Sequence, residues 1–185
     1  DIRTTLIRRT SDSDLDGGSG DDLDYTAESD MNLYQLSSKI DNSLGFTNFT
    51  FSRTEYDREY VNGTEIDTYD STSNTYILTN TLLKSNFDIT PGIEYEYFDG
   101  SFNNTGSYTA KVDTDGENVG YFVNGNLIAS DKLLVSAGIR EDDPSLFNNY
   151  TTYRLGGTYD LTGTLKLKSN YATSVKTPTL YEMHG

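Results

Sequence analysis

The segment Leu165-Lys-Leu-Lys-Ser-Asn-Tyr-Ala-Thr-Ser-Val175 decides how the rest of this 185-residue sequence is interpreted. Its apolar and aromatic residues fall on one parity, and its lysines fall on the other. Successive side chains of a β-strand point to opposite faces, so the segment is predicted to be a strand with one apolar and one polar face. Pro178, which lacks the N–H group that strand pairing needs, ends the strand.

Segments of similar character recur along the whole chain. Together with residues 165–175, the strand candidates are residues 1–10, 31–40, 46–60, 75–84, 89–99, 119–129, 133–141 and 150–159. Some connections have the composition of tight turns: residues 41–45, 85–88, 130–132 and 160–163. The others are predicted to be longer loops: residues 11–30, 61–74, 100–118 and 142–149. The predicted fold class is all-β, an antiparallel meander of about nine long strands.

The two kinds of connection alternate along the chain, and this order is informative. In an outer-membrane β-barrel every second connection is a short periplasmic turn, and the others are longer extracellular loops. A soluble β-sandwich has no reason to sort its connections in this way. Most strand candidates also reach the roughly 9–11 residues with which a tilted strand crosses the hydrocarbon, whereas strands of globular proteins usually have about 5–6. Both observations favour a partial transmembrane β-barrel.

The two faces of the strands give a second argument. Ile93, Tyr95 and Tyr97 alternate with Glu94 and Glu96. A lysine that faces lipid near the bilayer midplane costs about 2–4 kcal/mol, so the charged parity is predicted to face the barrel lumen. The alternation by itself also fits a sandwich that buries its apolar parity between two sheets. Strand length, the sorted connections and the 15 tyrosines, which suit interfacial girdles, favour the barrel.

Composition excludes several classes of protein. Only 34% of the residues are hydrophobic, and no apolar run approaches the roughly 18 residues that a membrane-spanning helix needs. The chain has no cysteine, so neither a disulfide framework nor a thiolate metal site can form. A net charge of −15 repels nucleic acid, which is therefore not a predicted partner.

The end of the chain carries a distinctive pattern. A strand with Tyr-x-Thr is followed by Pro-x-Leu-x-Glu and a closing glycine. The residues of this pattern are Tyr171, Thr173, Pro178, Leu180, Glu182 and Gly185. The pattern resembles a signature segment of TonB-dependent outer-membrane receptors, and most closely that of the cobalamin and siderophore receptor branch.

This resemblance implies a fold, a location and an activity. The chain is expected to be an internal part of one β-barrel domain, residues 1–185, with the plug domain and the C-terminal strands absent. It would belong to a non-enzymatic active transporter in the outer membrane of a Gram-negative bacterium, surrounded by outer-membrane lipid. The implied ligand is cobalamin or another corrinoid, or a ferric siderophore, and TonB would act through the missing plug. Loop tyrosines such as Tyr60, Tyr69 and Tyr108 are expected to offer flat contact area to the ligand.

The first predicted loop carries the strongest local chemistry. Asp12-Ser-Asp-Leu-Asp-Gly17 has the D-x-D-x-D-G spacing that opens a calcium loop. No basic residue between positions 11 and 30 balances the carboxylates that follow. The candidate ligands of Ca²⁺ are Asp12, Asp14, Asp16, Asp21, Asp22 and Asp24. The family resemblance supports calcium, since cobalamin receptors hold Ca²⁺ with aspartates of extracellular loops, although no cofactor is required. A solvated acidic loop is the alternative.

The sequence contains no catalytic constellation. His184 is the only histidine, which rules out a histidine-based catalytic pair or a two-histidine metal site within this chain. Glu94 and Glu96 lie two residues apart along one wall, so they are interpreted as structural or lumen-lining residues. Two other functions remain open at this point. One is a soluble, secreted, calcium-stabilised β-sandwich for adhesion or carbohydrate binding, and the other is a passive porin.

Overall fold

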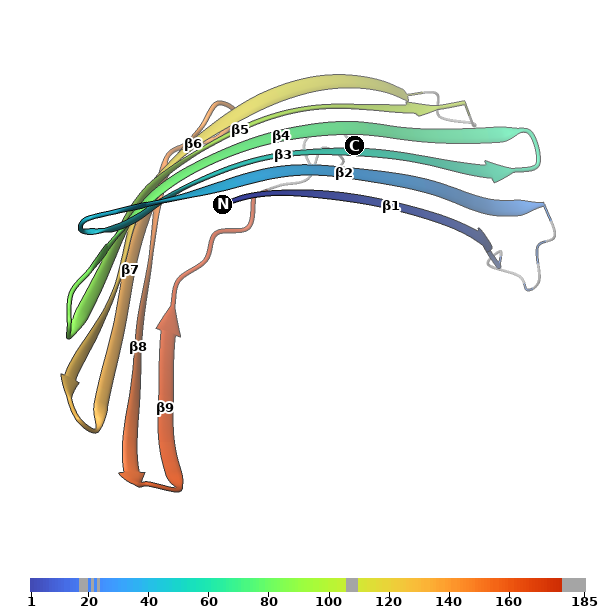
Figure 1. Ribbon diagram of the computed structural model, residues 1–185. Helices are drawn as coiled ribbons and strands as arrows, with labels where there is room; N and C mark the ends of the chain where they lie inside the picture. The colour runs from blue at the N-terminus through green and yellow to red at the C-terminus, as the bar shows by residue number, and fades with distance from the viewer. Residues whose placement is uncertain (17–19, 21, 23, 106–109, 178–185) are drawn as a thin grey trace.

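The chain folds as one antiparallel sheet whose strands follow one another in sequence order (Figure 1). The computed structural model describes residues 1–185 apart from 17–19, 21, 23, 106–109 and 178–185. The described residues form β1 (Ile2–Asp14), β2 (Tyr25–Asn42), β3 (Gly45–Asn62), β4 (Glu65–Leu83), β5 (Phe87–Asn104), β6 (Ala110–Ser130), β7 (Leu133–Pro144), β8 (Tyr150–Thr162) and β9 (Leu165–Ala172). They include no helix with the length and hydropathy to cross a bilayer.

The predicted all-β meander of nine strands is confirmed, and so are the tight turns. Short connections join β2 to β3, β4 to β5, β6 to β7 and β8 to β9. We call this side of the sheet the turn end and the opposite side the loop end. Over the described residues the sheet is open, because its order runs from β1 to β9 without pairing between these two strands. The strands form a curved wall rather than a flat layer (Figure 1).

The predicted long loops are largely wrong. Residues 61–74 belong mostly to β3 and β4, which are joined by a tight turn at Gly63 and Thr64. Gly63 has a φ of 59°, a conformation that glycine adopts without the steric strain of other residues. Strand also replaces part of the predicted loops over residues 11–30, 100–118 and 142–149.

The polarity of these segments explains why they are predicted as loops although they form strands. Toward the loop end most side chains are polar on both parities, apart from several aromatic residues, as expected where both faces of a sheet meet water. Continuous pairing still satisfies the backbone, from Gly45 opposite Leu82 to Asn62 opposite Glu65. Threonine and tyrosine, which are frequent in these segments, also favour strands. Composition alone therefore does not separate a solvated hairpin from a loop.

Several strands are longer than a membrane crossing requires. β2, β3 and β5 have 18 residues, β4 has 19 and β6 has 21. A tilted strand crosses the hydrocarbon in roughly 9–11 residues. The surplus lies at the loop end, where these strands continue side by side (Figure 1). The side chains of these extensions are mostly polar.

The two faces of the sheet differ as the parity pattern predicts. We call the face with Leu78 and Ile93 the outer face, and the face with Ile77 and Glu94 the inner face. An apolar belt of largely exposed side chains crosses the outer face: Leu36, Phe49, Leu78, Ile93, Val123, Ile139, Leu155 and Leu167. Among the described residues, Ala27 is the only buried apolar side chain. This single layer has no core between two sheets, which excludes the β-sandwich.

An aromatic girdle borders the apolar belt on its loop side. The ring centroids of Phe51 and Tyr76 lie 4.9 Å apart, and those of Tyr76 and Tyr95 lie 6.2 Å apart. Aromatic side chains suit the level of lipid headgroups, where one end of the ring is in an apolar medium and the other in water. Beyond the girdle, carboxylates replace apolar side chains on the outer face. This order of belt, girdle and charged extension is typical of a membrane-spanning barrel wall.

Candidate functional site on the inner face

Four aromatic side chains form a row on the inner face at the loop end. They are Tyr25 of β2, Tyr60 of β3, Tyr69 of β4 and Phe102 of β5. The ring centroids lie 6.5 Å apart for Tyr25 and Tyr60, and 5.9 Å apart for Tyr60 and Tyr69. Tyr69 and Phe102 are stacked, with centroids 4.7 Å apart. We call these four residues the aromatic row.

Strand register builds the aromatic row. Tyr69 lies directly opposite Phe102 on one side and opposite Arg58 on the other. The guanidinium of Arg58 lies over the ring of Tyr60, 4.4 Å from its centroid. Arg58 Nε is buried and has no hydrogen-bond partner among the described residues. Half-buried ring surface next to an unpaired donor suits a ligand with a flat or apolar surface and an acceptor oxygen.

The structure brings together two residues that the sequence predicts as ligand contacts. Tyr60 and Tyr69 contact each other, whereas Tyr108 lies outside the described residues. Tyr25 and Phe102 are not predicted, because their segments have the composition of loops. Odd or even position along the strand places both residues on the same face as Tyr60 and Tyr69. This information can be used only when the pairing of β2 to β5 is known.

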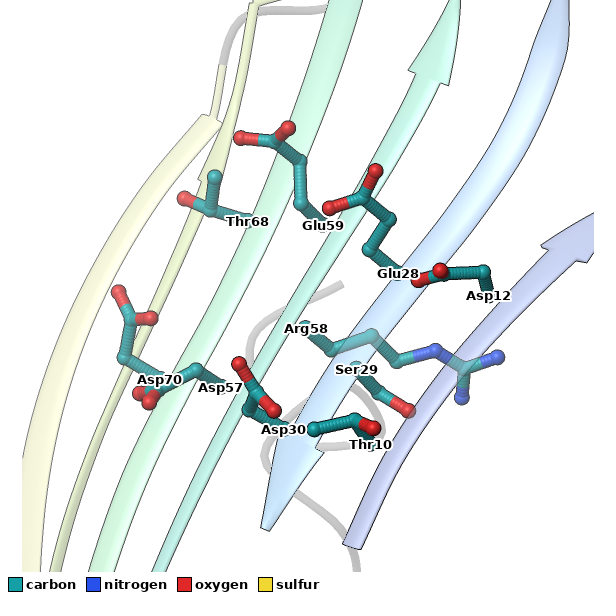
Figure 2. A pocket seen from close by; sticks show the side chains of 10 residues that line it. All are labelled: Thr10, Asp12, Glu28, Ser29, Asp30, Asp57, Arg58, Glu59, Thr68 and Asp70. Atoms are coloured by element: carbon teal, nitrogen blue, oxygen red, sulfur yellow. The ribbon is translucent and has the colours of Figure 1, made fainter.

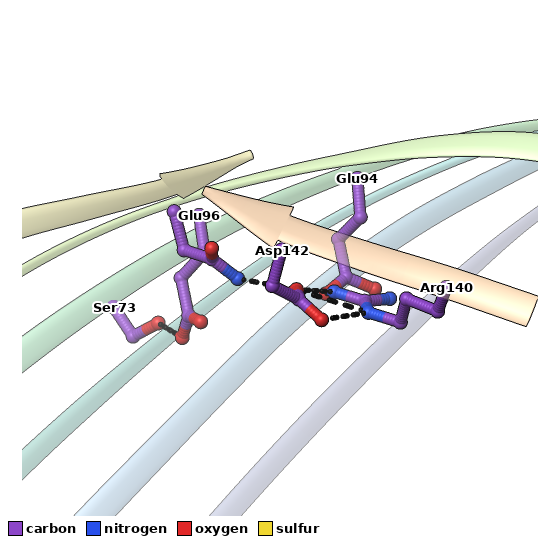
Figure 3. Close-up of polar contacts among 6 residues, drawn as sticks. Ser73, Glu94, Glu96, Arg140 and Asp142 are labelled. Carbon is purple, nitrogen blue, oxygen red and sulfur yellow. Dashed lines mark hydrogen bonds and ion pairs between the residues drawn. The ribbon is translucent and has the colours of Figure 1, made fainter. Parts of the chain in front are cut away.

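A second feature of the inner face is a polar network centred on Arg140 of β7 (Figure 3). Arg140 Nη2 donates to Glu94 Oε1 at 2.8 Å and to Asp142 Oδ1 at 2.7 Å. Arg140 Nε donates to Asp142 Oδ2 at 2.8 Å. Asn118 Nδ2 completes the network by donating to Asp142 Oδ1 at 2.8 Å. Charges of opposite sign from β5 and β7, together with an amide from β6, are thus joined directly.

The network depends on a glycine in the neighbouring strand. Gly120 lies directly opposite Asp142, and a Cβ at this position would lie 2.3 Å from Arg140 Nη2. The side chain of Asp142 is 4% exposed and that of Arg140 is 29% exposed. A buried carboxylate stays charged only beside a cation and further donors, which Arg140 and Asn118 supply. The network is therefore a charge-compensated part of the inner wall.

Glu94 and Glu96 both project from the inner face, as the sequence predicts, but they have different partners. Glu94 is bound by Arg140, whereas Glu96 accepts a hydrogen bond from the Ser73 hydroxyl at 2.9 Å (Figure 3). The two carboxylates therefore serve separate contacts across the wall.

The outer face of the loop end is strongly acidic (Figure 2). Asp57 of β3 lies directly opposite Asp30 of β2 and Asp70 of β4, at a hollow of about 440 Å³. Partial burial and the charges of Asp70, Glu55 and Asp30 raise the pKa of the Asp57 carboxyl above its ordinary value. Like charges at directly opposite positions are unfavourable in a sheet, and charges are costly in hydrocarbon. This surface is therefore suited to water rather than to hydrocarbon.

The structure distributes the predicted calcium ligands over the strand end and the connection. Asp12 and Asp14 belong to the outer face of β1, opposite Glu28 and Thr26 of β2. Asp22 and Asp24 precede β2, and Asp21 lies outside the described residues. Within the described parts of the chain, no group of three or more acidic or histidine side chains is placed to hold a metal ion. Calcium binding by this loop stays a prediction.

A calorimetric titration tests this prediction. If the loop binds Ca²⁺, the full-length receptor gives a heat of binding at roughly millimolar calcium, the range of extracellular calcium modules. Joint replacement of Asp12, Asp14 and Asp16 by asparagine should abolish that heat. A matched variant with asparagine at Asp57 and Asp70 removes carboxylates outside the loop and should keep it. A flat titration, or the same heat from both variants, contradicts calcium binding.

The terminal signature is described only in part. Tyr171 lies on β9, with its ring centroid 6.1 Å from that of Tyr153 on β8. Thr173 continues the pairing, since its N–H donates to the Tyr153 carbonyl and its hydroxyl accepts the Tyr153 N–H, both at 2.9 Å. The remaining residues of the pattern lie outside the described residues: Pro178, Leu180, Glu182 and Gly185.

Solved structures share this fold. The siderophore receptor PirA from Pseudomonas aeruginosa superposes with a TM-score of 0.64 at 18% identity, over 85% of this chain and 28% of PirA. The copper transporter OprC gives a TM-score of 0.69 at 12% identity, over 97% of this chain and 42% of OprC. The RagAB peptide importer in its open-open state gives 0.53 at 16% identity, over 80% of this chain and 22% of that one. At these identities the similarity concerns the fold alone, and this chain spans less than half the length of each.

A comparison at the level of sequence identifies the family. Curated proteins give no match to the chain. The family described as "TonB dependent receptor-like, beta-barrel" matches residues 2–185, which is nearly the whole sequence. The open meander, the outer apolar belt and the charged inner face are those of such a barrel wall. The chain belongs to the TonB-dependent receptor family, as part of its β-barrel domain.

Proposed function

We propose that this chain is part of an outer-membrane receptor that takes up a scarce ligand into a Gram-negative bacterium by active, non-enzymatic transport. One observation carries the proposal: a single sheet places an apolar belt on its outer face, while the charged parity lies on the inner face with the Arg140 network. Only a wall between lipid and a hydrated lumen uses both faces in this way. The transport cycle requires TonB acting on a plug domain of the whole receptor.

The proposed ligand is a bulky compound with flat or apolar surface, such as a ferric siderophore or a corrinoid. The support for this class is the aromatic row at the loop end, beside the buried, unpaired Nε of Arg58. The solved structures with this fold include a siderophore receptor, a copper transporter and a peptide importer, so the fold leaves the ligand open. The aromatic row favours a siderophore-like ligand, because stacked rings add little to the binding of a bare metal ion such as copper.

Removing one ring of the aromatic row tests the ligand class. In the full-length receptor, Tyr69→Ala should weaken binding about tenfold, because a central aromatic contact typically contributes more than 1 kcal/mol. The probes are a ferric catecholate siderophore and cyanocobalamin, each titrated by calorimetry. Tyr76→Ala is the matched control, since it removes a tyrosine of β4 from the outer face and should leave affinity unchanged. Equal losses in both variants, or binding of neither probe, would count against this ligand class.

Dependence on TonB separates the proposal from a passive porin. Cells that carry the full-length receptor should accumulate the probe only when the inner-membrane proton-driven complex is intact. A porin would equilibrate the probe at the same rate without that complex. Uptake that persists after loss of TonB therefore contradicts active transport but leaves the fold unaffected.

A further inference from the structure

The apolar belt contains a hollow between β5, β6 and β7, toward the turn end. Its volume is about 700 Å³. Gly125 and Ala137 lie directly opposite each other at its floor. The larger side chains that line it are Phe87, Ile89, Val123, Leu127, Val135 and Ile139. We call this hollow the belt groove.

Sequence creates the belt groove by placing two small residues where the belt otherwise carries large ones. Gly125 is also opposite Ile89. Gly125, which has no side chain, and Ala137, which has only a methyl group, are therefore surrounded by the bulky residues of three strands. The φ of Gly125 is not positive, and a Cβ there would be 3.2 Å from the Asp88 carbonyl oxygen and 3.8 Å from Ile89 Cγ1. The φ angle therefore does not demand glycine at this position, although the Asp88 carbonyl leaves a Cβ little room. Absence of a side chain, rather than strain, leaves the space.

The belt groove selects an apolar occupant. The polar side chains next to it belong to the inner face, where Asn126 Nδ2 donates to both carboxylate oxygens of Asp88 at 3.0 and 3.2 Å. These two groups are satisfied by each other on the far side of the sheet. The outer side offers methyl, methylene and phenyl surface, so a polar ligand would lose its hydration there without new hydrogen bonds. A hydrocarbon chain has no polar group whose hydration would be lost on entering the groove.

The position of the belt groove points to one leaflet. Phe87, at the turn-end side of the groove, is the first residue of β5, and Leu127 opposite it lies three residues before the end of β6. Both are therefore close to the short turns, which face the periplasm in outer-membrane barrels. Those turns carry exposed Lys84, Asp131 and Lys132. Both signs of charge are thus available to a headgroup that carries a phosphate and an ammonium. The loop end of the outer face, in contrast, is acidic.

We propose that the belt groove holds one acyl chain of a zwitterionic diacyl phospholipid from the periplasmic leaflet, such as phosphatidylethanolamine. The inference rests on the proposed outer-membrane location. The lipid chain fills space that no protein atom occupies and restores the dispersion contacts that an empty hollow in the belt forfeits. Its headgroup lies beside the lysines of the two turns.

Photocrosslinking tests the occupant. The full-length receptor is placed in nanodiscs of phosphatidylethanolamine that carries a diazirine on one acyl chain, and labelled peptides are identified by mass spectrometry. Labelling of residues 123–127 and 135–139 should exceed labelling around Phe49 and Leu78 of the same belt by about fivefold, the ratio for a modest preference. Ala137→Leu fills the belt groove and should remove the excess. Ser38→Leu adds the same side chain to the outer face of β2, away from the groove, and should preserve the excess.

Each other outcome overturns a defined part of the proposal. Equal labelling across the belt means that the groove is ordinary lipid-facing surface. A groove that is less labelled than the rest of the belt means that a second polypeptide covers it. Excess labelling by a diazirine-bearing lipopolysaccharide, but not by the phospholipid, means that the groove belongs to the other leaflet and that the proposed leaflet is wrong. If no position of the belt is labelled, the outer-membrane location itself fails, which separates that failure from failure of the groove.

Discussion

Leu78→Arg is expected to lower the free energy of unfolding of the receptor barrel by about 2–4 kcal/mol, the cost of a guanidinium on the lipid face near the bilayer midplane. Leu78 is 47% exposed on the outer face of β4, with Ile93 directly opposite. No carboxylate of the apolar belt is available to compensate the new charge. The destabilisation follows directly from the assignment of the outer face to lipid.

Ile77→Arg, at the adjacent position of the same strand, is the matched control. Ile77 lies on the inner face opposite Glu94, so the new guanidinium would meet water and a carboxylate. The measurement is denaturant unfolding of the full-length receptor refolded into phospholipid vesicles. A loss of stability that is equal for the two variants, or larger for Ile77→Arg, would contradict the assignment of the faces.

Arg140→Ala is expected to destabilise the same barrel by about 3 kcal/mol, because removal of one partner leaves a buried charge without compensation. Asp142 is 4% exposed and would retain only the Asn118 hydrogen bond. Glu94 would lose its partner as well. The expected value lies at the low end of the range for buried pairs, since Arg140 itself is partly exposed to the lumen.

The control for this variant is Arg154→Ala, which removes an exposed guanidinium from the inner face of β8 and should cost less than about 1 kcal/mol. A triple variant with Arg140→Met, Asp142→Asn and Glu94→Gln should recover most of the lost stability, because it leaves no unpaired charge. Denaturant unfolding in vesicles measures all three. If the triple variant is as unstable as Arg140→Ala, packing rather than charge compensation explains the effect.

The sequence predicts the membrane-spanning part of the fold well, because lipid and lumen impose opposite requirements on alternating residues. The alternation of Ile93 and Tyr95 with Glu94 and Glu96 correctly gives both the strand and its faces. The turns at the turn end are also correctly predicted, since each interrupts the alternation with short polar segments. In these regions local pattern and tertiary environment agree.

The loop end is predicted poorly for a physical reason. Residues 61–74 of β3 and β4 lack the alternation on which strand prediction depends, as expected where both faces of a sheet meet water, so they resemble a loop. Pairing continues because each strand supplies hydrogen-bond partners to its neighbours, an effect that depends on the partner strand rather than on the local sequence. Register then decides which side chains meet.

The candidate site shows the same limit. Tyr60 and Tyr69 are predicted as ligand contacts from residue type alone, but their contact with each other is set by pairing. The Arg140 network is not predicted, since its carboxylates come from β5 and β7 and its space comes from a glycine in β6. The sequence pattern gives the face of each residue, and only the register gives its partners.

Spin-label accessibility of neighbouring residues on one strand tests the central claim most directly. The chain contains no cysteine, so single cysteines can be introduced at Leu78 and Ile77 on β4, and at Ile93 and Glu94 on β5, without removing any native thiol. In the full-length receptor in vesicles, labels at Leu78 and Ile93 should be accessible to oxygen and shielded from a polar nickel chelate. Labels at Ile77 and Glu94 should show the reverse. Equal accessibility of both parities, or chelate access to Leu78 and Ile93, would contradict the claim that the outer face of this sheet contacts lipid.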